Sequence, residues 1–454
     1  MDYRTLNPAT EELIETYPLA TAPEIERAVE RSARAFRDWR ATRLDERSGA
    51  LLRAASALES RASELAGLMA LEMGKPLPQG EAEARKCALG CRWFAEHGAR
   101  LLEPEPHDCD ASESFVRFDP LGPIFAIMPW NFPFWQFFRF AAPALMAGNT
   151  VVLKHAPGTP RCALVIESLM REAGFPEGVV GNLFLDNEQA AAVIADDRIR
   201  GVTLTGSTAA GRQVASVAGR HLKRIVLELG GSDPFIVAED ADLADAVGVA
   251  VTARCQNSGQ SCIAAKRFLV ARARFEEFAA SFVGAMERQR VGDPTAAGTD
   301  IGPLARADLR HGLAKQVEDS VAAGAEVLCG GEVPEQKGFY YPPTVLSRIP
   351  AGSPADRDEL FGPAAALFPV ADDDEAIRIA NSTSYGLGAS VWTRDPHRAR
   401  RYAEAIEAGS VFVNGQVKSD PRLPFGGVKD SGFGRELGRD GMMEFVNKKT
   451  VWIR

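Results

Sequence analysis

From Pro123 onward, short runs rich in β-branched residues alternate with longer runs of helical periodicity. The strand-like runs lie at residues 150–153, 201–205 and 224–229, and the helical runs between them at 161–172 and 209–218. Strands that alternate with helices predict a parallel sheet whose two faces are both covered.

A second set of the same kind begins near Pro234 with FIVAED. It continues through AAKRFLVARARFEEFAASFVGAM and VWTRDPHRARRYAEAI to SVFVNG. Because 454 residues exceed what one hydrophobic core usually serves, we expect two α/β domains in series, with a boundary near LGG at residues 229–231.

The first hundred residues have a different texture and predict scaffolding helices. Apolar residues recur every three to four positions over residues 23–39 and 46–73. Prolines at 104, 106 and 120 then bracket a polar segment in which residues 114–118 alternate like an exposed strand. This strand could be an arm used for assembly.

Charge and cysteine usage narrow the class of partner. With 52 basic and 61 acidic side chains the net charge is −9, and no basic run suggests nucleic acid or an anionic membrane surface. The apolar stretch 125–148 is interrupted by three prolines and Arg139, which argues against a membrane span. Seven scattered cysteines and no signal-like N-terminus predict a reduced, cytoplasmic protein with a small-molecule substrate.

A glycine turn in VTLTGSTAAG is a candidate phosphate site. Gly206 and Ser207 follow a strand-like run, and Gly211 lies at the start of the next helix. Backbone N–H groups and the helix dipole would face an anion there. The three-glycine dinucleotide fingerprint is absent, so a tight strand-to-helix turn is the competing explanation.

Three residues are candidates for covalent chemistry. Cys262 lies in the glycine- and serine-rich loop QNSGQSC, Glu228 ends the apolar run RIVLE, and Asn131 stands among aromatics and prolines in PWNFP. A thiol, a carboxylate of raised pKa and an amide donor suit a nucleophile, a general base and an oxyanion site. Considered singly, each has a structural alternative: core packing, a capping or paired carboxylate, and a braced turn.

A metal site could be drawn through Cys87, Cys91, His97, His107 and Cys109. Their spacing matches no two-by-two zinc pattern, and Cys87 and Cys91 share one helical face. Core packing is the better interpretation, and we expect no metal.

Considered together, these motifs resemble the aldehyde dehydrogenase family. PWNFP, VVLKHAPGTP, LTGSTAAG, LELGGSDPFIV, NSGQSCIAAKR, ELFGP and PFGGVKDSGFGRELG occur in the family's order, and Cys262 lies 34 positions after Glu228. The resemblance implies a Rossmann-type cofactor domain (1–101 and 121–229), an α/β catalytic domain (230–438) and a β-ribbon oligomerisation element (102–120 and 439–454). It also implies a homodimer or homotetramer.

The resemblance assigns roles residue by residue. Cys262 becomes the nucleophile, Glu228 the base that activates water, and Asn131 with the Cys262 N–H the oxyanion site. The residues implied to hold the cofactor are Trp130, Lys154, Pro157, Gly206, Ser207, Gly211, Leu229, Glu359 and Phe361.

Cofactor choice is implied by Pro157. NAD-preferring relatives have a glutamate three residues after the ribose-binding lysine, where it repels a 2′-phosphate; here that position is Pro157, after Lys154. We therefore expect NADP to be accepted and preferred, with NAD as the alternative.

The strings MPWNFP, LKHAP and GQSCIAAKRF most resemble bacterial succinate-semialdehyde dehydrogenases of the shorter type, which implies oxidation of succinate semialdehyde. Arg139 stands where the family binds the substrate carboxylate, whereas Gln256 replaces a second arginine of longer members and Ala264 a regulatory cysteine. Lys418, Ser419 or Arg422 could supply a further contact.

Three alternatives stay open. Within the class, the substrate could be another small aldehyde such as glutarate semialdehyde. A thiol esterase would use Cys262 and Glu228 without any nicotinamide, and a binding protein could keep the fold without activity.

Overall fold

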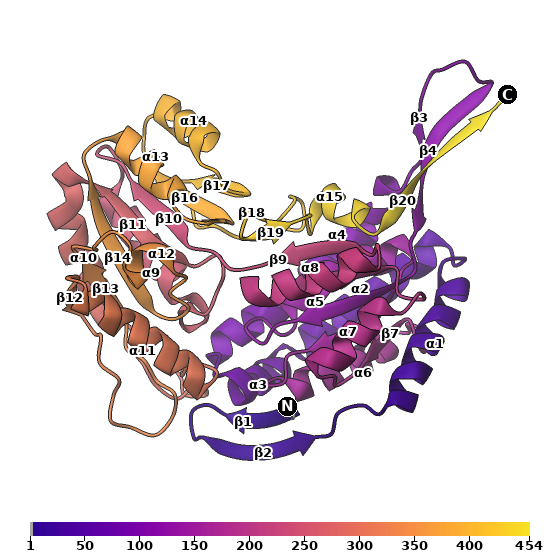
Figure 1. Cartoon of the computed structure of the whole chain (residues 1–454), viewed down its shortest axis with the longest axis horizontal. Coiled ribbons are helices and arrows are strands. Elements are labelled where there is room, and N and C mark those ends of the chain that lie inside the picture. The colour runs from indigo at the N-terminus through magenta and orange to yellow at the C-terminus, as the bar shows by residue number, and fades with distance from the viewer. Residues whose placement is uncertain (1–2) are drawn as a thin grey trace.

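The computed structural model describes residues 3–454 and contains two large sheets and a small projecting one (Figure 1). The six-stranded sheet and its helices lie on the right of the view, the seven-stranded sheet on the left, and the three-stranded sheet at the upper right. Among the described residues, no helix combines the length and the apolar character needed to cross a membrane.

The first sheet has the order β19-β9-β8-β5-β6-β7 and is parallel except for β19. Its strands are β5 (Pro123–Met128), β6 (Thr150–His155), β7 (Val180–Asn182), β8 (Gly201–Thr205), β9 (Arg224–Glu228) and β19 (Gly432–Phe433). Strands β6 and β8 are buried along their whole length, as expected for a sheet that helices cover on both faces.

Eight helices accompany this sheet: α1 (Ala22–Trp39), α2 (Leu44–Ser60), α3 (Ala62–Met73), α4 (Leu77–Leu101), α5 (Trp135–Ala147), α6 (Pro160–Glu172), α7 (Asn187–Ala195) and α8 (Thr208–Arg220). The stretch 125–148 becomes β5 and the fully buried α5. Cys87 and Cys91 lie buried on one face of α4, as the sequence predicts.

The helix predicted over residues 46–73 is wrong as a single element, because these residues form two helices that part at Arg61. The antiparallel pair β1 (Tyr3–Asn7) and β2 (Glu12–Tyr17) precedes the predicted helices, in a segment for which the sequence predicted no strand. The pair is anchored from a distance, because the Tyr3 hydroxyl donates to the carbonyls of His155 and Leu185. Because distant contacts hold these short strands, their sequence shows no apolar periodicity from which they could be predicted.

The second sheet has the order β12-β13-β14-β11-β10-β16-β17, with only β12 antiparallel to its neighbour. Its strands are β10 (Asp233–Val237), β11 (Ala265–Ala271), β12 (Glu326–Cys329), β13 (Thr344–Ser347), β14 (Ala364–Val370), β16 (Gly388–Trp392) and β17 (Ser410–Val413). Its helices are α9 (Leu243–Cys255), α10 (Phe275–Glu287), α11 (Ala307–Ala322), α12 (Pro354–Arg357), α13 (Asp373–Asn381) and α14 (Pro396–Ala405).

The projecting sheet consists of β3 (Glu105–Pro106), β4 (Glu113–Pro120) and β20 (Val446–Ile453), the last preceded by α15 (Gly438–Met443). Strand β4 contains the strand predicted at 114–118 and pairs along all eight residues of β20. We call this sheet the ribbon.

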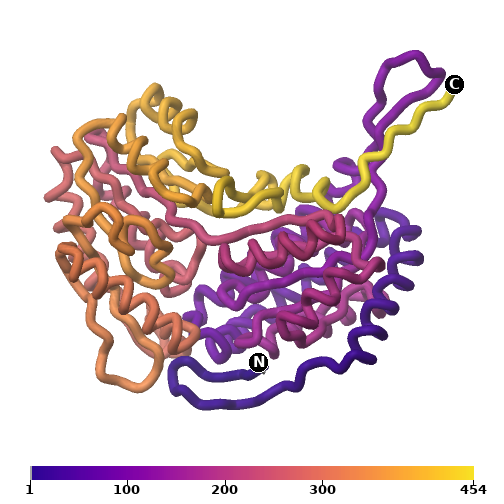
Figure 2. Tube along the Cα trace, viewed as in Figure 1, coloured from indigo at the N-terminus to yellow at the C-terminus, as the bar shows by residue number. Residues whose placement is uncertain are grey.

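Near its end the chain returns from the second sheet to the first. Figure 2 shows this C-terminal segment, in yellow, running from one part of the molecule across the other to the ribbon. On the way, β19 pairs with β9 and places Gly432 opposite Glu228. Residues 432–433 therefore join the first sheet, although they lie within the range expected for the second domain.

Candidate active site

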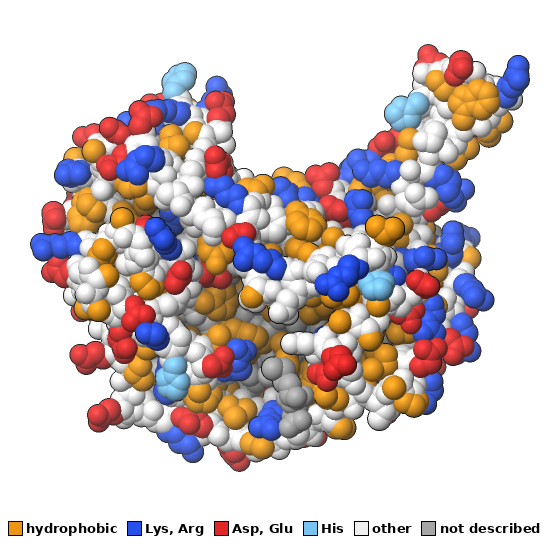
Figure 3. Space-filling model, in the orientation of Figure 1, with side chains coloured by type: hydrophobic (Ala, Val, Ile, Leu, Met, Phe, Trp, Pro, Cys, Tyr) orange, Lys and Arg blue, Asp and Glu red, His pale blue; other side chains and the backbone are white. Residues whose placement is uncertain are grey.

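The predicted catalytic and cofactor residues gather where the two sheets face each other. Asn131, Ser207 and Glu228 follow or end the neighbouring strands β5, β8 and β9, at their carboxyl ends. The chain order reverses between β5 and β8, which is where open parallel sheets bind ligands. Cys262 comes from the opposite side, in the loop before β11. Figure 3 shows the surface hollowed between the two parts of the molecule.

Cys262 is half-buried in a tightly held loop. The Lys266 ammonium donates to the carbonyls of Ser261 (2.8 Å) and Cys262 (2.6 Å). A side chain at Gly231 would come within 2.6 Å of the Cys262 carbonyl oxygen, so only glycine fits there. Burial raises the pKa of the Cys262 thiol to about 12, while the charges of Arg139 and Lys266 lower it. The cations of Arg139 and Lys266 only partly offset the effect of burial, so the thiol needs a base to become a thiolate at neutral pH.

Asn131 is buried and held from several sides. Its amide Nδ2 donates to the carbonyl of Gln260 (3.1 Å), two residues before Cys262. The backbone carbonyl of Asn131 accepts hydrogen bonds from Lys75 Nζ (3.0 Å) and Asn257 Nδ2 (2.8 Å). The structure thus directs the amide of Asn131 toward the loop that carries the thiol, as an oxyanion donor requires.

The same loop carries strained backbone. Asn257 and Ser258 have φ of 57° and 55° and are both buried in the short 3-10 turn η1 (Gln256–Gly259). Non-glycine residues rarely adopt this left-handed conformation, and it persists only where surrounding contacts enforce it. Here the contacts are those of Asn257 with Asn131 and of the Asn257 N–H with Gln79 Oε1 (2.6 Å).

Glu228 is a buried carboxylate with no hydrogen-bond partner in the described part of the chain. Burial raises its pKa well above the usual range, the nearby Glu436 carboxylate adds to the rise, and Arg139 opposes it. Glu436 is itself buried and forms an ion pair with Arg139. A carboxylate kept out of water beside a second one has the raised pKa that a general base near neutral pH requires.

Lys154, at the end of β6, is a cation available to an anionic ligand. Burial lowers its pKa to about 8, and among residues 3–454 it has no ion pair with a carboxylate. Ser207 caps α8, with its hydroxyl accepting from the Ala210 N–H (3.3 Å), and the Gly206 N–H donates to the Glu228 carbonyl (3.0 Å). The N-terminus of α8 and Lys154 lie at the same carboxyl edge of the sheet, after β8 and on β6, and these two features fit the phosphates of a dinucleotide.

Gly211 lies farther from this turn than its predicted role suggests. It is buried one turn into α8, where a Cβ would meet the side chain of Leu229 at 2.6 Å. Its direct neighbour is therefore Leu229, and the absence of a side chain lets α8 pack closely against that residue.

The residues predicted at the nicotinamide end also lie together. The rings of Trp130 and Phe361 meet edge to face at 5.8 Å. Glu359 accepts the Gly231 N–H (3.1 Å) and lies 3.4 Å from Lys266 Nζ, which links it to the Cys262 loop. Burial raises the pKa of Glu359, and Lys266 opposes the rise.

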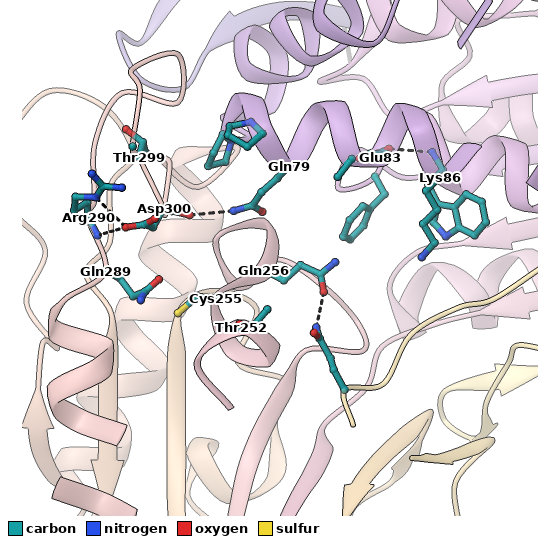
Figure 4. A pocket seen from close by; sticks show the side chains of 17 residues that line it. Gln79, Glu83, Lys86, Thr252, Cys255, Gln256, Gln289, Arg290, Thr299 and Asp300 are labelled. Carbon is teal, nitrogen blue, oxygen red and sulfur yellow. Dashed lines mark hydrogen bonds and ion pairs between the residues drawn. The ribbon is translucent and has the colours of Figure 1, made fainter. Parts of the chain in front are cut away.

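A cavity of about 570 Å³ opens beside α4 (Figure 4). Glu83 and Lys86 lie on one side of it, Arg290, Thr299 and Asp300 on the other, with Gln256 between them. Gln256 accepts a hydrogen bond from Gln416 (2.8 Å), as the figure marks.

The predicted substrate residues fall into different places. Gln256 lines the cavity, and Ser419 is buried behind it, whereas Lys418 and Arg422 are exposed and Arg422 pairs with Asp420. Arg139 is buried in its ion pair with Glu436, its guanidinium 4.6 Å from the ring of Phe425.

Several residues that shape the site escaped the sequence analysis: Lys75, Glu83, Lys86, Asn257 and Glu436. Glu83 pairs with Lys75 and accepts the N–H groups of Phe134 (3.0 Å) and Trp135 (2.9 Å), so it caps α5 and braces Asn131 through Lys75. Glu436 lies in the GRELG motif and Asn257 in the cysteine loop, which could have marked them. Lys75, Glu83 and Lys86 lie in no motif that the sequence analysis identified, so nothing in the sequence marked them as site residues.

Comparison with known proteins agrees with this geometry. The model of the aldehyde dehydrogenase family matches residues 1–451. The chain belongs to the aldehyde dehydrogenase family and has its fold.

The chain is similar to known proteins over the full length of both. The chain is 51% identical, over 100% of both chains, to a probable succinate-semialdehyde dehydrogenase [NADP(+)] of Synechocystis, and 49% identical, again over 100% of both, to succinate-semialdehyde dehydrogenase [NADP(+)] 1 of Mycobacterium bovis. Among solved structures, Gox0499 superimposes with a TM-score of 0.99 at 42% identity over 100% of both chains. Succinic semialdehyde dehydrogenase of Streptococcus pyogenes, solved with NADP+, gives 0.97 at 35% identity over 99% of both.

Proposed function

We propose that this enzyme oxidises succinate semialdehyde to succinate, with NADP as the hydride acceptor. The observation that carries the proposal is that Asn131 and Glu228 lie at the carboxyl ends of strands of the first sheet, with Asn131 bonded to the Cys262 loop and Arg139 acting on the pKa of both Cys262 and Glu228. The full-length similarity to succinate-semialdehyde dehydrogenases [NADP(+)] supports the choice of substrate and cofactor.

The chemistry follows from the residues in place. The Cys262 thiolate forms a bond to the aldehyde carbon, and the carbonyl oxygen becomes an oxyanion that Asn131 Nδ2 and the Cys262 N–H stabilise. When bound, the nicotinamide supplies the acceptor for the hydride that leaves this carbon, which gives a thioester on sulfur. Glu228 then takes a proton from water, the hydroxide attacks the thioester carbon and the Cys262 thiolate leaves. The proton held by Glu228 returns to the thiolate, which gives the carboxylic acid, the free thiol and the regenerated base.

The cofactor residues fit a dinucleotide with a 2′-phosphate. Lys154 offers positive charge, and the N-terminus of α8, which begins directly after the turn of Gly206 and Ser207, offers N–H donors. Pro157 brings no carboxylate against the phosphate. Trp130, Leu229, Glu359 and Phe361 would hold the nicotinamide riboside half, with Gly211 as the packing residue behind Leu229. NAD remains a poorer alternative because the site has nothing that excludes it.

We also propose the expected organisation. Residues 1–101 and 121–229 would bind the cofactor, 230–438 would carry the nucleophile, and 102–120 with 439–454 would join subunits in a cytoplasmic homodimer or homotetramer. The two sheets and the ribbon support this division, apart from β19. The seven free thiols are consistent with a reducing compartment.

Steady-state kinetics test the proposal. We expect kcat/KM with NADP and succinate semialdehyde to exceed the value with NAD, and the value with glutarate semialdehyde. A tenfold preference for NAD would contradict the cofactor assignment, and turnover of neutral aldehydes alone would contradict the substrate. Product formation without any cofactor would instead indicate a thiol esterase.

A further inference from the structure

Lys86 is a cation at the cavity wall, and the carboxylates that act on its charge, Glu83 and Asp420, are paired with Lys75 and Arg422. Its ammonium donates to Ser419 Oγ at 2.8 Å and lies 4.5 Å from the ring centroid of Trp135. In the described part of the chain, Lys86 forms no ion pair with a carboxylate. A half-buried ammonium held only by a hydroxyl and an aromatic ring retains unsatisfied charge and N–H groups.

The other cations beside the cavity are already paired. Arg290 has Asp300 as its partner at 3.2 Å, and Lys75 is paired with Glu83. Arg139, deeper in the site, has Glu436. Substrate carboxylate at any of these would have to displace a protein carboxylate, whereas at Lys86 it would fill a vacant place.

The groups around Lys86 match a short chain that ends in a carboxylate. Ser419 Oγ already accepts from both Lys86 and Trp135 Nε1 (3.0 Å), so its own proton is free to be donated. Lys86 and Ser419 together therefore present donors to one anion, while Phe132 and Trp135 offer an apolar wall to methylene groups.

This wall leads back to the reacting centre. Phe132 and Trp135 line the cavity and follow Asn131 by one and four residues, and the Asn131 amide donates to the Gln260 carbonyl in the loop that carries Cys262. An aldehyde held at Cys262 and Asn131 would thus have its far end directed along α5 toward Lys86.

We propose that Lys86, together with the Ser419 hydroxyl, is the counter-ion that binds the substrate's carboxylate and makes the enzyme selective for ω-carboxy aldehydes. The role rests on the proposed function, because a neutral substrate would not need it. In this arrangement Arg139 holds Glu436 and acts on the charge of the catalytic residues.

The test compares Lys86→Gln with the wild type, using succinate semialdehyde and butanal at saturating NADP. Loss of a charge-assisted contact should lower kcat/KM for succinate semialdehyde about 30-fold, mainly through KM, and change the value for butanal less than about threefold. Lys86→Arg should restore much of the selectivity. Arg85→Gln, which removes an exposed cation next to Lys86 on α4, is the matched control and should change neither value.

The outcomes separate the two proposals. Butanal turnover shows that Lys86→Gln has folded, and an unchanged ratio of the two kcat/KM values in that variant overturns the role of Lys86. If Arg139→Gln loses the selectivity while Lys86→Gln keeps it, the carboxylate contact belongs to Arg139. A wild type that does not prefer succinate semialdehyde over butanal overturns the proposed function, and the role of Lys86 with it.

Discussion

Glu228 lies in a dry site beside a second carboxylate, and this position determines which step it can serve. Replacement by glutamine keeps its size and removes the base, so the thioester should form and then hydrolyse slowly. We expect Glu228→Gln to release one equivalent of reduced cofactor per site in a rapid burst, with steady-state turnover at least about 100-fold slower. Stopped-flow absorbance of the reduced cofactor measures both phases.

The pH profile of the same experiment provides the control. Because burial and Glu436 raise the pKa of Glu228, the basic form is populated as pH rises through that value, and wild-type turnover should rise with it. The variant should lose this rise. A variant that lost the burst as well would place Glu228 before hydride transfer, contrary to the proposed role.

Lys86 should impose a pH dependence of its own. Burial and the charge of Arg139 lower its pKa to about 8, against the opposing effects of Cys87, Glu83 and Asp420. The ammonium is charged below that value and neutral above it. Selectivity for succinate semialdehyde over butanal should therefore fall as pH rises through about 8, because the attraction for the carboxylate is lost.

Lys154 has a pKa near the same value, so the comparison needs saturating NADP and a ratio of two aldehydes, in which effects on the cofactor cancel. Lys86→Gln should show a low ratio at every pH. A wild-type ratio that stays constant between pH 7 and 9 would contradict the assignment.

Helix α8 offers a matched pair of glycines at the scale of an element. A Cβ at Gly211 would meet Leu229 at 2.6 Å, whereas a Cβ at Gly219, farther along the helix, has nothing within 4 Å. Gly211→Ala should push Leu229 or α8 away from the nicotinamide site, at a cost of about 1–3 kcal/mol. Gly219→Ala should stabilise the helix by up to about 1 kcal/mol.

We expect Gly211→Ala to raise KM for NADP severalfold, with a smaller effect on KM for the aldehyde. Gly219→Ala should leave both unchanged and raise the temperature of unfolding slightly. Equal behaviour of the two variants would show that Gly211 does not position the cofactor site.

Sequence reasoning succeeded where chemistry and local pattern coincide. Strand β8 lies at the predicted residues, Glu228 ends β9, and Ser207 stands at the start of the predicted helix as the N-cap of α8. Those positions follow from periodicity and from motifs within a few residues of each other.

It failed where distant segments meet. Ser419 and Lys86 are 333 residues apart in the sequence. Strand β19 has only two residues, which is too short a pattern to predict its pairing with β9. The partner of Arg139, Glu436, is equally remote, so the sequence suggested a free arginine for the substrate. Only tertiary packing determines which cations are neutralised and which remain available.

At the scale of the whole molecule, the ribbon is the feature whose outer edge has no pairing strand within the described part of the chain. Strand β20 is an edge strand of eight residues, unpaired on its outer side in the described structure, and it projects from the body with Trp452 and Ile453 exposed at 47% and 45% (Figure 1). A long edge with exposed apolar side chains invites pairing with another chain. This supports the proposed homo-oligomer.

The double variant Trp452→Asp with Ile453→Asp places two charges at this edge and should dissociate the oligomer to single chains, as measured by light scattering after size-exclusion chromatography. Val327→Asp changes an exposed residue of edge strand β12, on the opposite side of the molecule in Figure 1, and should leave the mass unchanged. Because Cys262, Glu228 and Lys86 lie away from the ribbon, within one chain, dissociated subunits that stay folded should keep a measurable burst of reduced cofactor. A wild type with the mass of one chain, or a double variant with unchanged mass, would show that the ribbon does not join subunits.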